Sequence, residues 1–420
     1  MVPSTVVYVA AVPISVIVAL GLLRKWRSRK WASCVSNTCL RGKTFLITGA
    51  NSGIGYETAK SLVRRKGRVI FACRDIAKAK EAIALIRKEQ PLGGEMIPMQ
   101  LDLSSFESIE KFVEIVKAGF HKIDVLINNA GVVVPLNQDL KTKEGFEIHF
   151  GVNHLGHFYL TNLLMDLLKR ATPSRFNTIL ICQSTEAVIV NGGWRSSRDS
   201  RRPECLWRSE RDWDDVSSFC EAVMLAKKEA GHVRERTSSP PSLHERYSGR
   251  RGSRKVLWPP IVVVSSTLHE RGNINFDDLN IRKEIEQAKK KGGSSRHNPG
   301  YSNSKLMNAY FARALACNLR NTGIDVNLVC PGFCATNLFR YSIKWYHYIF
   351  MAPILIAFMK TAKQGSETVV FCATDHSIEG KTGKFYRDCA EYNSKYNFDK
   401  DVETKLWNVS EELVKARKPL

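Results

Sequence analysis

The segment that most constrains the fold is the run TFLITGANSGIG at residues 44–55. It begins with an apolar stretch typical of a buried strand, continues through Gly49, Gly53 and Gly55, and leads into the helical pattern YETAKSLVRRKG. Glycines at these places let the backbone turn tightly and approach a pyrophosphate group, which the N-terminus of the helix binds. Three glycines alone are a weak signal, but the strand–turn–helix context favours a dinucleotide-binding turn.

Alternating strand and helix patterns follow this turn. The strand patterns cover 68–72, 96–101 and 124–128, and helical patterns near 75–89 and 105–120 lie between them. Strands that alternate with helices form parallel sheets with helices on both faces. We therefore predict an α/β fold, a single doubly wound parallel-sheet Rossmann domain.

The end of the second predicted strand indicates which dinucleotide is bound. An acidic residue there would accept a hydrogen bond from the ribose 2′-OH of NAD, whereas a guanidinium pairs with the 2′-phosphate of NADP. The sequence at this place is Cys73-Arg74-Asp75, and Arg74 favours NADP(H). Asp75 is evidence for NAD, although it fits equally well as the N-terminal residue of the next helix.

A tyrosine and a lysine in PGYSNSK, residues 299–305, are the candidate catalytic pair. On a helix, Tyr301 and Lys305 are four residues apart and share one face. A cation beside a phenol favours the phenolate, so we expect Lys305 to lower the pKa of Tyr301. Such a tyrosine exchanges a proton with a hydroxyl group while hydride moves to or from a nicotinamide.

The N-terminus has the pattern of a membrane anchor. Residues 2–23 contain no charged side chain, and the next seven, RKWRSRK, carry five positive charges. The apolar run is long enough to cross about 30 Å of hydrocarbon as a helix, and its charge follows the run rather than preceding it as in a cleaved signal peptide. We predict an uncleaved anchor at 1–23 and a basic linker at 24–40, with the remainder in the cytosol. The alternative is a buried N-terminal core helix.

Four further motifs occur in a fixed order: NNAG at 128–131, NHLGHF at 153–158, VVVSS at 262–266 and PGFCAT at 331–336. Together with TGANSGIG and PGYSNSK, they make the chain resemble the short-chain dehydrogenase/reductase family. Within that family, KTKEGFEIHFGVNHLGHFYLTNLL, NINFDDLN and KLWNVSEELV resemble the microsomal retinol dehydrogenase branch. We assign 41–175 and 261–415 to the Rossmann domain on this basis, and the branch implies a single-pass endoplasmic reticulum membrane protein.

The resemblance implies a role for each matching residue. Tyr301 is the acid/base, Lys305 orients the ribose, Ser266 binds the substrate oxygen, and Asn153 supports Lys305 through a water relay. Besides Arg74, Tyr301 and Lys305, the implied cofactor-binding residues are Gly49, Asn51, Ser52, Gly53, Ile54, Gly55, Asp102, Leu103, Asn129, Ala130, Gly131, Pro331, Gly332 and Thr336. Two simpler interpretations stay open: a structural polar group for Asn153, and an ordinary loop hydroxyl for Thr336.

Taken together, these features predict a membrane-anchored, NADP(H)-dependent oxidoreductase. The resemblance implies retinol and retinal as substrates. The apolar run at 345–359, which is either an amphipathic cover or a core helix, suits a lipophilic substrate. A steroid or other lipid carbonyl reductase is the first alternative, and a non-catalytic dinucleotide-binding scaffold is the second. The oligomeric state is left open.

Charge and cysteine content exclude other classes of protein. The formal net charge of +22 first suggests nucleic acid or an anionic membrane, but the basic flank of the anchor accounts for part of it. We expect no nucleic-acid partner, because no aromatic platform on a recognisable fold accompanies the charge. The 11 cysteines are scattered without CxxC pairs, which indicates reduced thiols rather than disulfides or a zinc site, and no metal site is expected.

The tract 176–260 does not fit the rest of the chain. Its 85 residues show no sustained strand or helix period, and removing them joins TPSR directly to IVVVSS. We interpret the tract as a disordered insertion or as non-coding sequence translated in error. It also contains an imitation of the fifth strand at 178–185, with Ser184 in the serine's place. We prefer 261–267, because GNINFDDLN follows there.

Deleting Phe176 to Pro260 should give a protein at least as stable and as active as the full chain. A tract without a core-forming period cannot bury enough apolar surface to offset its ordering entropy. Thermal unfolding and retinal reduction, measured on both proteins in one detergent, test this expectation. An unfolded or inactive deletion variant beside a working full chain would show that the tract is integral to the domain.

Overall fold

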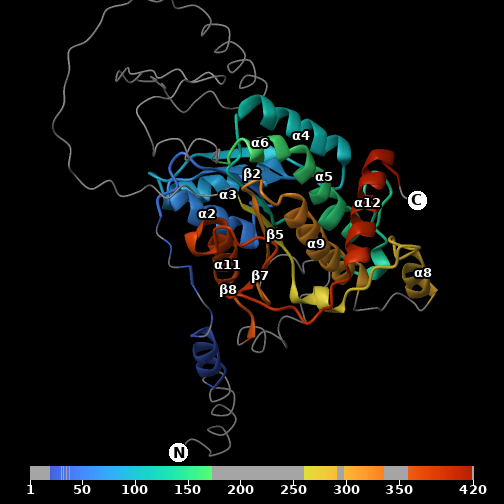
Figure 1. Cartoon of the computed structure of the whole chain (residues 1–420). Helices are drawn as coiled ribbons and strands as arrows, with labels where there is room; N and C mark the ends of the chain where they lie inside the picture. The colour runs from blue at the N-terminus through green and yellow to red at the C-terminus, as the bar shows by residue number, and fades with distance from the viewer. Residues whose placement is uncertain are drawn as a thin grey trace, which may run out of the picture. The chain divides into compact units, whose positions relative to one another are not determined.

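The computed structural model describes residues 19–29, 31, 33–34, 36, 38–172, 260–290, 298–334 and 358–418. Within them the chain forms an eight-stranded sheet of order β3-β2-β1-β4-β5-β6-β7-β8 (Figure 1). All neighbouring strands from β3 to β7 are parallel, and β8 pairs with β7 in the antiparallel sense. The predicted Rossmann-type parallel sheet is confirmed.

The bounds of the elements agree with the alternating pattern of the sequence. The strands are β1 Thr44–Thr48, β2 Arg68–Cys73, β3 Met96–Gln100, β4 Val125–Asn128, β5 Pro260–Val264, β6 Asp325–Cys330, β7 Phe385–Arg387 and β8 Ala390–Glu391. The α-helices are α2 Gly53–Arg64, α3 Ile76–Glu89, α4 Phe106–Gly119, α5 Gly156–Leu163, α6 Met165–Lys169, α8 Arg282–Lys290, α9 Pro299–Asn318, α11 Ala362–Thr374 and α12 Lys400–Ala416. The shorter helical turns are η1 Leu136–Gln138, η2 Phe150–Leu155, η4 Thr267–Arg271 and η6 His376–Ile378.

Helices cover both faces of the sheet because successive strand residues point to opposite sides. In β1, Leu46 belongs to one apolar cluster, whereas Phe45 and Ile47 belong to the other. The first cluster contains side chains of α4, α5, α9 and α12, and the second contains side chains of α2, α3 and α11. These two groups of helices lie on opposite sides of the sheet (Figure 1). The central strands β1, β4 and β5 are buried along their whole length as a result.

The fifth strand is Pro260–Val264, and it lies between β4 and β6. Ile261 pairs with Leu126 on one side and with Val326 on the other. The preferred assignment of this strand is therefore confirmed, while the alternative at 178–185 lies outside the described residues. Proline is tolerated at the first position of a strand, where no ladder hydrogen bond from its nitrogen is required. Because Pro260 is part of β5, the deletion proposed above is better ended at residue 259.

The N-terminal region is described only in part. Residues 19–28 are helical, and the Arg24 guanidinium donates a hydrogen bond of 3.3 Å to the carbonyl of Met359. Arg27 lies over the ring of Phe358, 4.9 Å from its centroid. Among the described residues, no helix is both long and apolar enough to span a bilayer. Residues 1–18 of the predicted anchor, and 176–259 of the predicted insertion, lie outside the described part of the chain.

Candidate active site

The predicted site residues that the structure describes lie at the carboxyl ends of the parallel strands, in the turns that follow them and on η2 and α9. Parallel strands have their carboxyl ends at one edge, and open sheets of this type bind ligands there. The turn after β1 shows why glycine is required. Gly49 has φ +69° and Gly53 has φ +59°, a backbone region that favours glycine. A Cβ atom on Gly55 would lie 2.4 Å from the carbonyl oxygen of Gly49, so a side chain there would force the turn apart.

The start of α2 is suited to an anion. Its N-cap residue, Ser52, makes no side-chain hydrogen bond to the helix. The first backbone N–H groups of α2 therefore have no side-chain acceptor and are available to a phosphate oxygen. Asn51 and Ile54, also predicted to bind the cofactor, belong to the same turn.

The threonine that ends β1 joins this turn to the turn after β4. Thr48 Oγ1 accepts hydrogen bonds of 2.9 Å from the backbone nitrogens of Asn129 and Ala130. The Asn129 side chain donates back to the Thr48 carbonyl at 2.8 Å. Thr48 Oγ1 also lies 2.9 Å from His157 Nε2. The sequence motifs TGANSGIG, NNAG and NHLGHF therefore meet at one hydroxyl group.

The ends of β2 and β3 carry the residues predicted to meet the adenosine part of the cofactor. Arg74 is exposed and has no hydrogen bond or ion pair with the described residues. Asp75 caps α3 by accepting a hydrogen bond of 3.1 Å from the Lys78 nitrogen, and hydrogen bonds to Lys78 lower its pKa. This structural role removes Asp75 as evidence for NAD. Asp102 accepts hydrogen bonds from the Ser104 nitrogen and hydroxyl, and buried Leu103 follows it.

Asn153 lies in η2, a π-helical turn immediately before α5. Such turns are rare and frequently occur at functional sites. Its side-chain oxygen accepts a hydrogen bond of 2.8 Å from the Val132 nitrogen, and its amide donates 3.0 Å to the Ser304 hydroxyl. A Cβ atom on Gly131 would lie 3.4 Å from Asn153 Oδ1 and 3.7 Å from Lys305 Nζ. Asn153 therefore braces the turn after β4 and borders the same space as Lys305.

The structure brings Ser266, Tyr301 and Lys305 together. Lys305 Nζ lies 5.6 Å from the centroid of the Tyr301 ring and donates a hydrogen bond of 3.1 Å to the Val264 carbonyl. Ser266 follows β5, and its side chain is close enough to Tyr301 to lower the pKa of that phenol, while its hydroxyl accepts a hydrogen bond of 3.2 Å from the Leu268 nitrogen. The preceding serine, Ser265, instead donates to the Lys305 carbonyl at 3.0 Å. Of the two adjacent serines, Ser266 is the one beside the phenol.

Burial determines the protonation of the candidate catalytic pair. Burial raises the pKa of Tyr301, an effect that Cys330 reinforces and the nearby Ser266 side chain opposes. It lowers the pKa of Lys305 to about 8. In this structure the pKa of Tyr301 lies above its ordinary value, contrary to the expected lowering, because burial disfavours the charged phenolate. At neutral pH, Tyr301 is a phenol and Lys305 is mostly an ammonium ion.

The turn after β6 closes the same edge of the sheet. Pro331 and Gly332 begin it, and Gly332 has φ +87°. A Cβ atom on Gly332 would lie 3.5 Å from Nζ of Lys360, which is 5% exposed and paired with Asp388. Thr336 and most of the apolar run at 345–359 lie outside the described residues.

Sequence reasoning missed Thr48, His157 and Lys360 as parts of this site. The signal for His157 was its place four residues after Asn153 in NHLGHF, since its Nδ1 lies 3.0 Å from the Asn153 carbonyl oxygen. Burial lowers its pKa to about 4, so it is neutral. No local pattern indicates Lys360, because its partner Asp388 is distant in the sequence.

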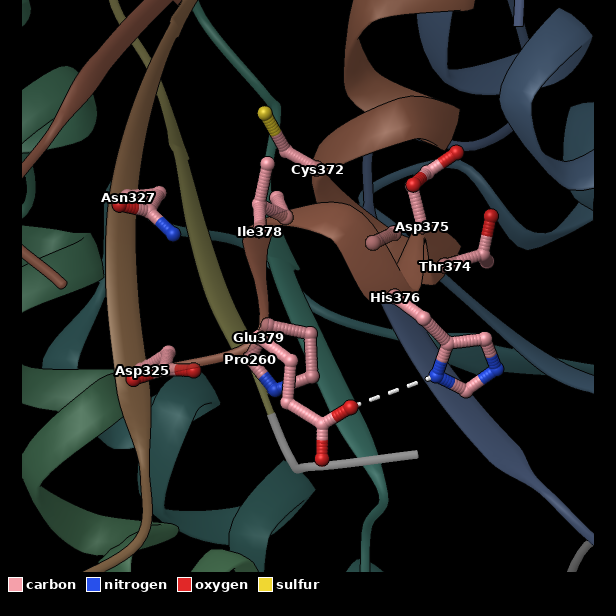
Figure 2. Close-up of a pocket in the computed structure, with 10 residues that line it drawn as sticks. Pro260, Asp325, Asn327, Cys372, Thr374, Asp375, His376, Ile378 and Glu379 are labelled. Atoms are coloured by element: carbon pink, nitrogen blue, oxygen red, sulfur yellow. Dashed lines mark ion pairs between the residues drawn. The ribbon is translucent and has the colours of Figure 1, made fainter. Parts of the chain in front are cut away.

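A small surface hollow lies away from these residues (Figure 2). Pro260 and Asp325, the first residues of β5 and β6, line it together with His376 and Glu379, which form an ion pair at 3.5 Å. This hollow therefore lies at the amino ends of the parallel strands, whereas Tyr301 lies near their carboxyl ends. It is not part of the candidate active site.

Comparison with known proteins agrees with this geometry. A family model described as short chain dehydrogenase matches residues 43–190 and 290–347. Retinol dehydrogenase 14 of Homo sapiens is 34% identical, in an alignment covering 89% of this chain and 87% of that protein. Retinol dehydrogenase 12 of Homo sapiens is 31% identical, with 91% and 90% covered.

Solved structures share the fold at lower sequence identity. An uncharacterized protein from Mycobacterium paratuberculosis has a TM-score of 0.51 and 24% identity, covering 92% of this chain and 99% of that one. A protein described as a NAD(P)-dependent gluconate 5-dehydrogenase from Beutenbergia cavernae has a TM-score of 0.50 and 17% identity, covering 84% and 96%. At these identities the likeness concerns the fold alone.

The lowered pKa of Lys305 predicts a pH-dependent contribution to stability. Between pH 8 and the ordinary lysine value of 10.5, the unfolded chain binds more protons at this residue than the folded chain does. Below pH 8, Lys305 is charged and buried in the folded state, and its desolvation lowers the free energy of unfolding. This destabilisation disappears as the pH rises and Lys305 loses its proton. Relative to Lys305→Met, the free energy of unfolding of the wild type should rise by up to about 3 kcal/mol over this range.

Urea unfolding at a series of pH values measures this difference. The exposed Lys363 supplies the matched control, since Lys363→Met removes a solvated cation and should give no such pH dependence. A difference between wild type and Lys305→Met that stays constant with pH would contradict the burial of a charged Lys305.

Proposed function

The chain belongs to the short-chain dehydrogenase/reductase family, in its retinol dehydrogenase branch, and we propose that it interconverts retinol and retinal with NADP(H). Family membership makes it an oxidoreductase. The observation that carries the proposal is the meeting of Ser266, Tyr301 and Lys305, braced by Asn153, at the carboxyl edge of the sheet.

The residues at this edge fit a dinucleotide. The uncapped start of α2 and the glycine turn after β1 suit a pyrophosphate. The unpaired, exposed guanidinium of Arg74 suits the extra phosphate of NADP better than a ribose hydroxyl. Gly131 places no side chain beside Lys305 Nζ, whose ammonium would donate to ribose hydroxyls. When bound, the nicotinamide supplies or accepts the hydride.

Proton transfer is the part of the reaction that this chain's own residues perform. Ser266 holds the substrate oxygen by a hydrogen bond, next to the Tyr301 hydroxyl. In reduction, Tyr301 donates its proton to the oxygen of the aldehyde as the carbonyl carbon takes up hydride; in oxidation, the phenolate removes the proton from the alcohol. Burial keeps Tyr301 protonated at neutral pH, which is the form that donates a proton to an aldehyde oxygen.

The substrate proposal rests on the relatives and on apolar surface. The relatives named above are retinol dehydrogenases. Phe333, directly after the Pro331–Gly332 turn, is 55% exposed, and Phe358 is 41% exposed. Apolar side chains at this place suit a long lipid alcohol or aldehyde. A steroid or another lipid carbonyl compound is the alternative within the same chemistry, and a panel of such substrates with NADPH distinguishes them.

We propose that residues 1–23 anchor the protein in the endoplasmic reticulum membrane as a single span, with the catalytic domain in the cytosol. The support is the uncharged run followed by five positive charges. Leu22 and Trp26, on the helical residues 19–28, are 63% and 54% exposed, as expected of side chains that meet lipid.

Tyr301→Phe tests the proposed function directly. The change keeps the ring and its packing but removes the hydroxyl, so kcat for retinal reduction should fall by about 10²–10⁴-fold while NADPH binding is retained. Tyr159→Phe is the matched control, because it removes a hydroxyl that bonds Glu110 away from the site. A loss below about tenfold for Tyr301→Phe would remove it as the acid/base.

Arg74→Asp tests the cofactor assignment. The change removes a charge-assisted phosphate contact and adds a repulsion, so the KM for NADPH should rise far more than that for NADH. Arg41→Asp makes the same change of charge at the opposite, amino end of β1 and should affect both cofactors little. Equal losses for NADPH and NADH in Arg74→Asp would show that another residue selects the cofactor.

A further inference from the structure

Two buried polar residues next to the site have no part in the chemistry described so far. Glu147 is 4% exposed and His149 is fully buried. The Glu147 carboxylate accepts hydrogen bonds of 2.9 Å from the backbone nitrogens of His149 and Phe150 and lies 2.5 Å from His149 Nδ1. A buried carboxylate is costly unless its hydrogen bonds are satisfied, and these three donors satisfy it.

The hydrogen bonds determine which ring nitrogen of His149 carries the proton. The backbone nitrogen of Val134 donates to His149 Nε2 at 3.0 Å. A backbone N–H can only donate, so Nε2 holds a lone pair and the proton is on Nδ1, toward Glu147. His149 is therefore a neutral imidazole, oriented by a carboxylate on one side and accepting from the loop after β4 on the other.

Val134, whose nitrogen donates to His149, also binds the N-cap residue of α9 through its carbonyl. The Asn298 side chain donates a hydrogen bond of 2.8 Å to the Val134 carbonyl and accepts one of 2.8 Å from the Gly300 nitrogen. Gly300 immediately precedes Tyr301. A continuous series of hydrogen bonds thus runs from Glu147 to the first turn of the helix that carries the acid/base.

Packing brings the pair directly against this turn. A Cβ atom on Gly300 would lie 3.1 Å from both Glu147 Oε1 and His149 Nδ1, so α9 approaches the pair as closely as glycine permits. The His149 ring meets the Tyr301 ring edge-on, with centroids 6.2 Å apart. The loop itself is held twice: Asn153 binds Val132, and His149 binds Val134.

We propose that Glu147 and His149 are positioning residues that set the place of Tyr301 relative to the loop at 131–134. The inference rests on the proposed function, because it assigns their effect to the reaction of Tyr301. Small displacements of a reacting group lower rates strongly, by up to about 10²-fold for 1 Å. Neither residue exchanges a proton with the substrate; they act through the hydrogen bonds to Val134 and through contact with Gly300.

Three substitutions of His149 separate this role from simple stabilisation. In His149→Gln the side-chain oxygen can replace Nε2 as the acceptor for Val134. In His149→Asn the shorter amide can still donate to Glu147 but leaves the Val134 nitrogen without a partner. In His149→Phe both contacts are lost.

We expect His149→Gln to keep kcat for retinal reduction within about threefold of the wild type, and the Asn and Phe variants to lose at least about tenfold. The KM for NADPH should change less than kcat in all three, because the glycine turn after β1, which holds the pyrophosphate, is untouched. His154→Asn is the matched control: His154 is buried in the same motif, but its Nε2 bonds Ser410 of α12. That control should lower Tm without lowering kcat.

Hydrogen–deuterium exchange of the full-length variants in detergent supplies a readout independent of activity. Peptides covering 131–135 and 298–301 should exchange faster in the Asn and Phe variants and at the wild-type rate in the Gln variant. Equal exchange in all three, or kcat values that follow Tm regardless of the side chain, would overturn the proposal. A wild type without turnover on any lipid aldehyde would refute the proposed function, and an altered exchange pattern would then still show that His149 positions α9.

Discussion

The organisation of the site depends on the hydroxyl group of Thr48, at the end of β1. The carbonyl of Asn153 can only accept, so the proton of His157 is on Nδ1 and Nε2 takes the proton of Thr48. The Thr48 oxygen is then free to accept from the backbone nitrogens of Asn129 and Ala130. One buried hydroxyl uses both its donor and its acceptor capacity to join three segments distant in the sequence. Since burial keeps His157 neutral, this junction persists across physiological pH.

Burial also changes how the candidate catalytic pair should work. A lysine beside a tyrosine is expected to favour the phenolate before the reaction begins, but here the phenol is the stable form. The cation gains importance once Tyr301 has given up its proton, because the phenolate then forms in a poorly solvated site beside an ammonium group. Lys305, with a pKa of about 8, is still charged at neutral pH and can stabilise the Tyr301 phenolate. The pair is therefore arranged for proton donation.

Sequence patterns predicted the fold, and which candidate residues lie close together, better than they predicted the pKa values of those residues. The parallel sheet, the glycine turn and the juxtaposition of Tyr301 with Lys305 follow from local periodicity and from spacing along one helix. The direction of the pKa shift of Tyr301 could not be predicted, because it depends on how much water the folded chain excludes from the phenol. Nor could the role of His149: its partners Glu147 and Val134 meet it only through the tertiary path of the loop after β4. Asp75 was ambiguous in sequence, and only its hydrogen bond to Lys78 identifies it as a cap.

The sheet geometry also explains how the long tract between α6 and β5 can be compatible with an intact site. The chain leaves the described fold after α6, whose Leu167 carbonyl binds the Ile123 nitrogen just before the start of β4. It returns at Pro260, the first residue of β5. Both junctions are at the amino edge of the sheet, whereas Ser266 and Tyr301 are at the carboxyl edge, about 17 Å away along a five-residue strand. The register of β5 is fixed independently by its pairing with β4 and β6. A slip of one residue would exchange the faces of Ile261 and Val263 with those of Val262 and Val264, and would break the hydrogen bond from Ser265 to the Lys305 carbonyl. The position of Ser266 is thus determined by the sheet and not by the tract that precedes it.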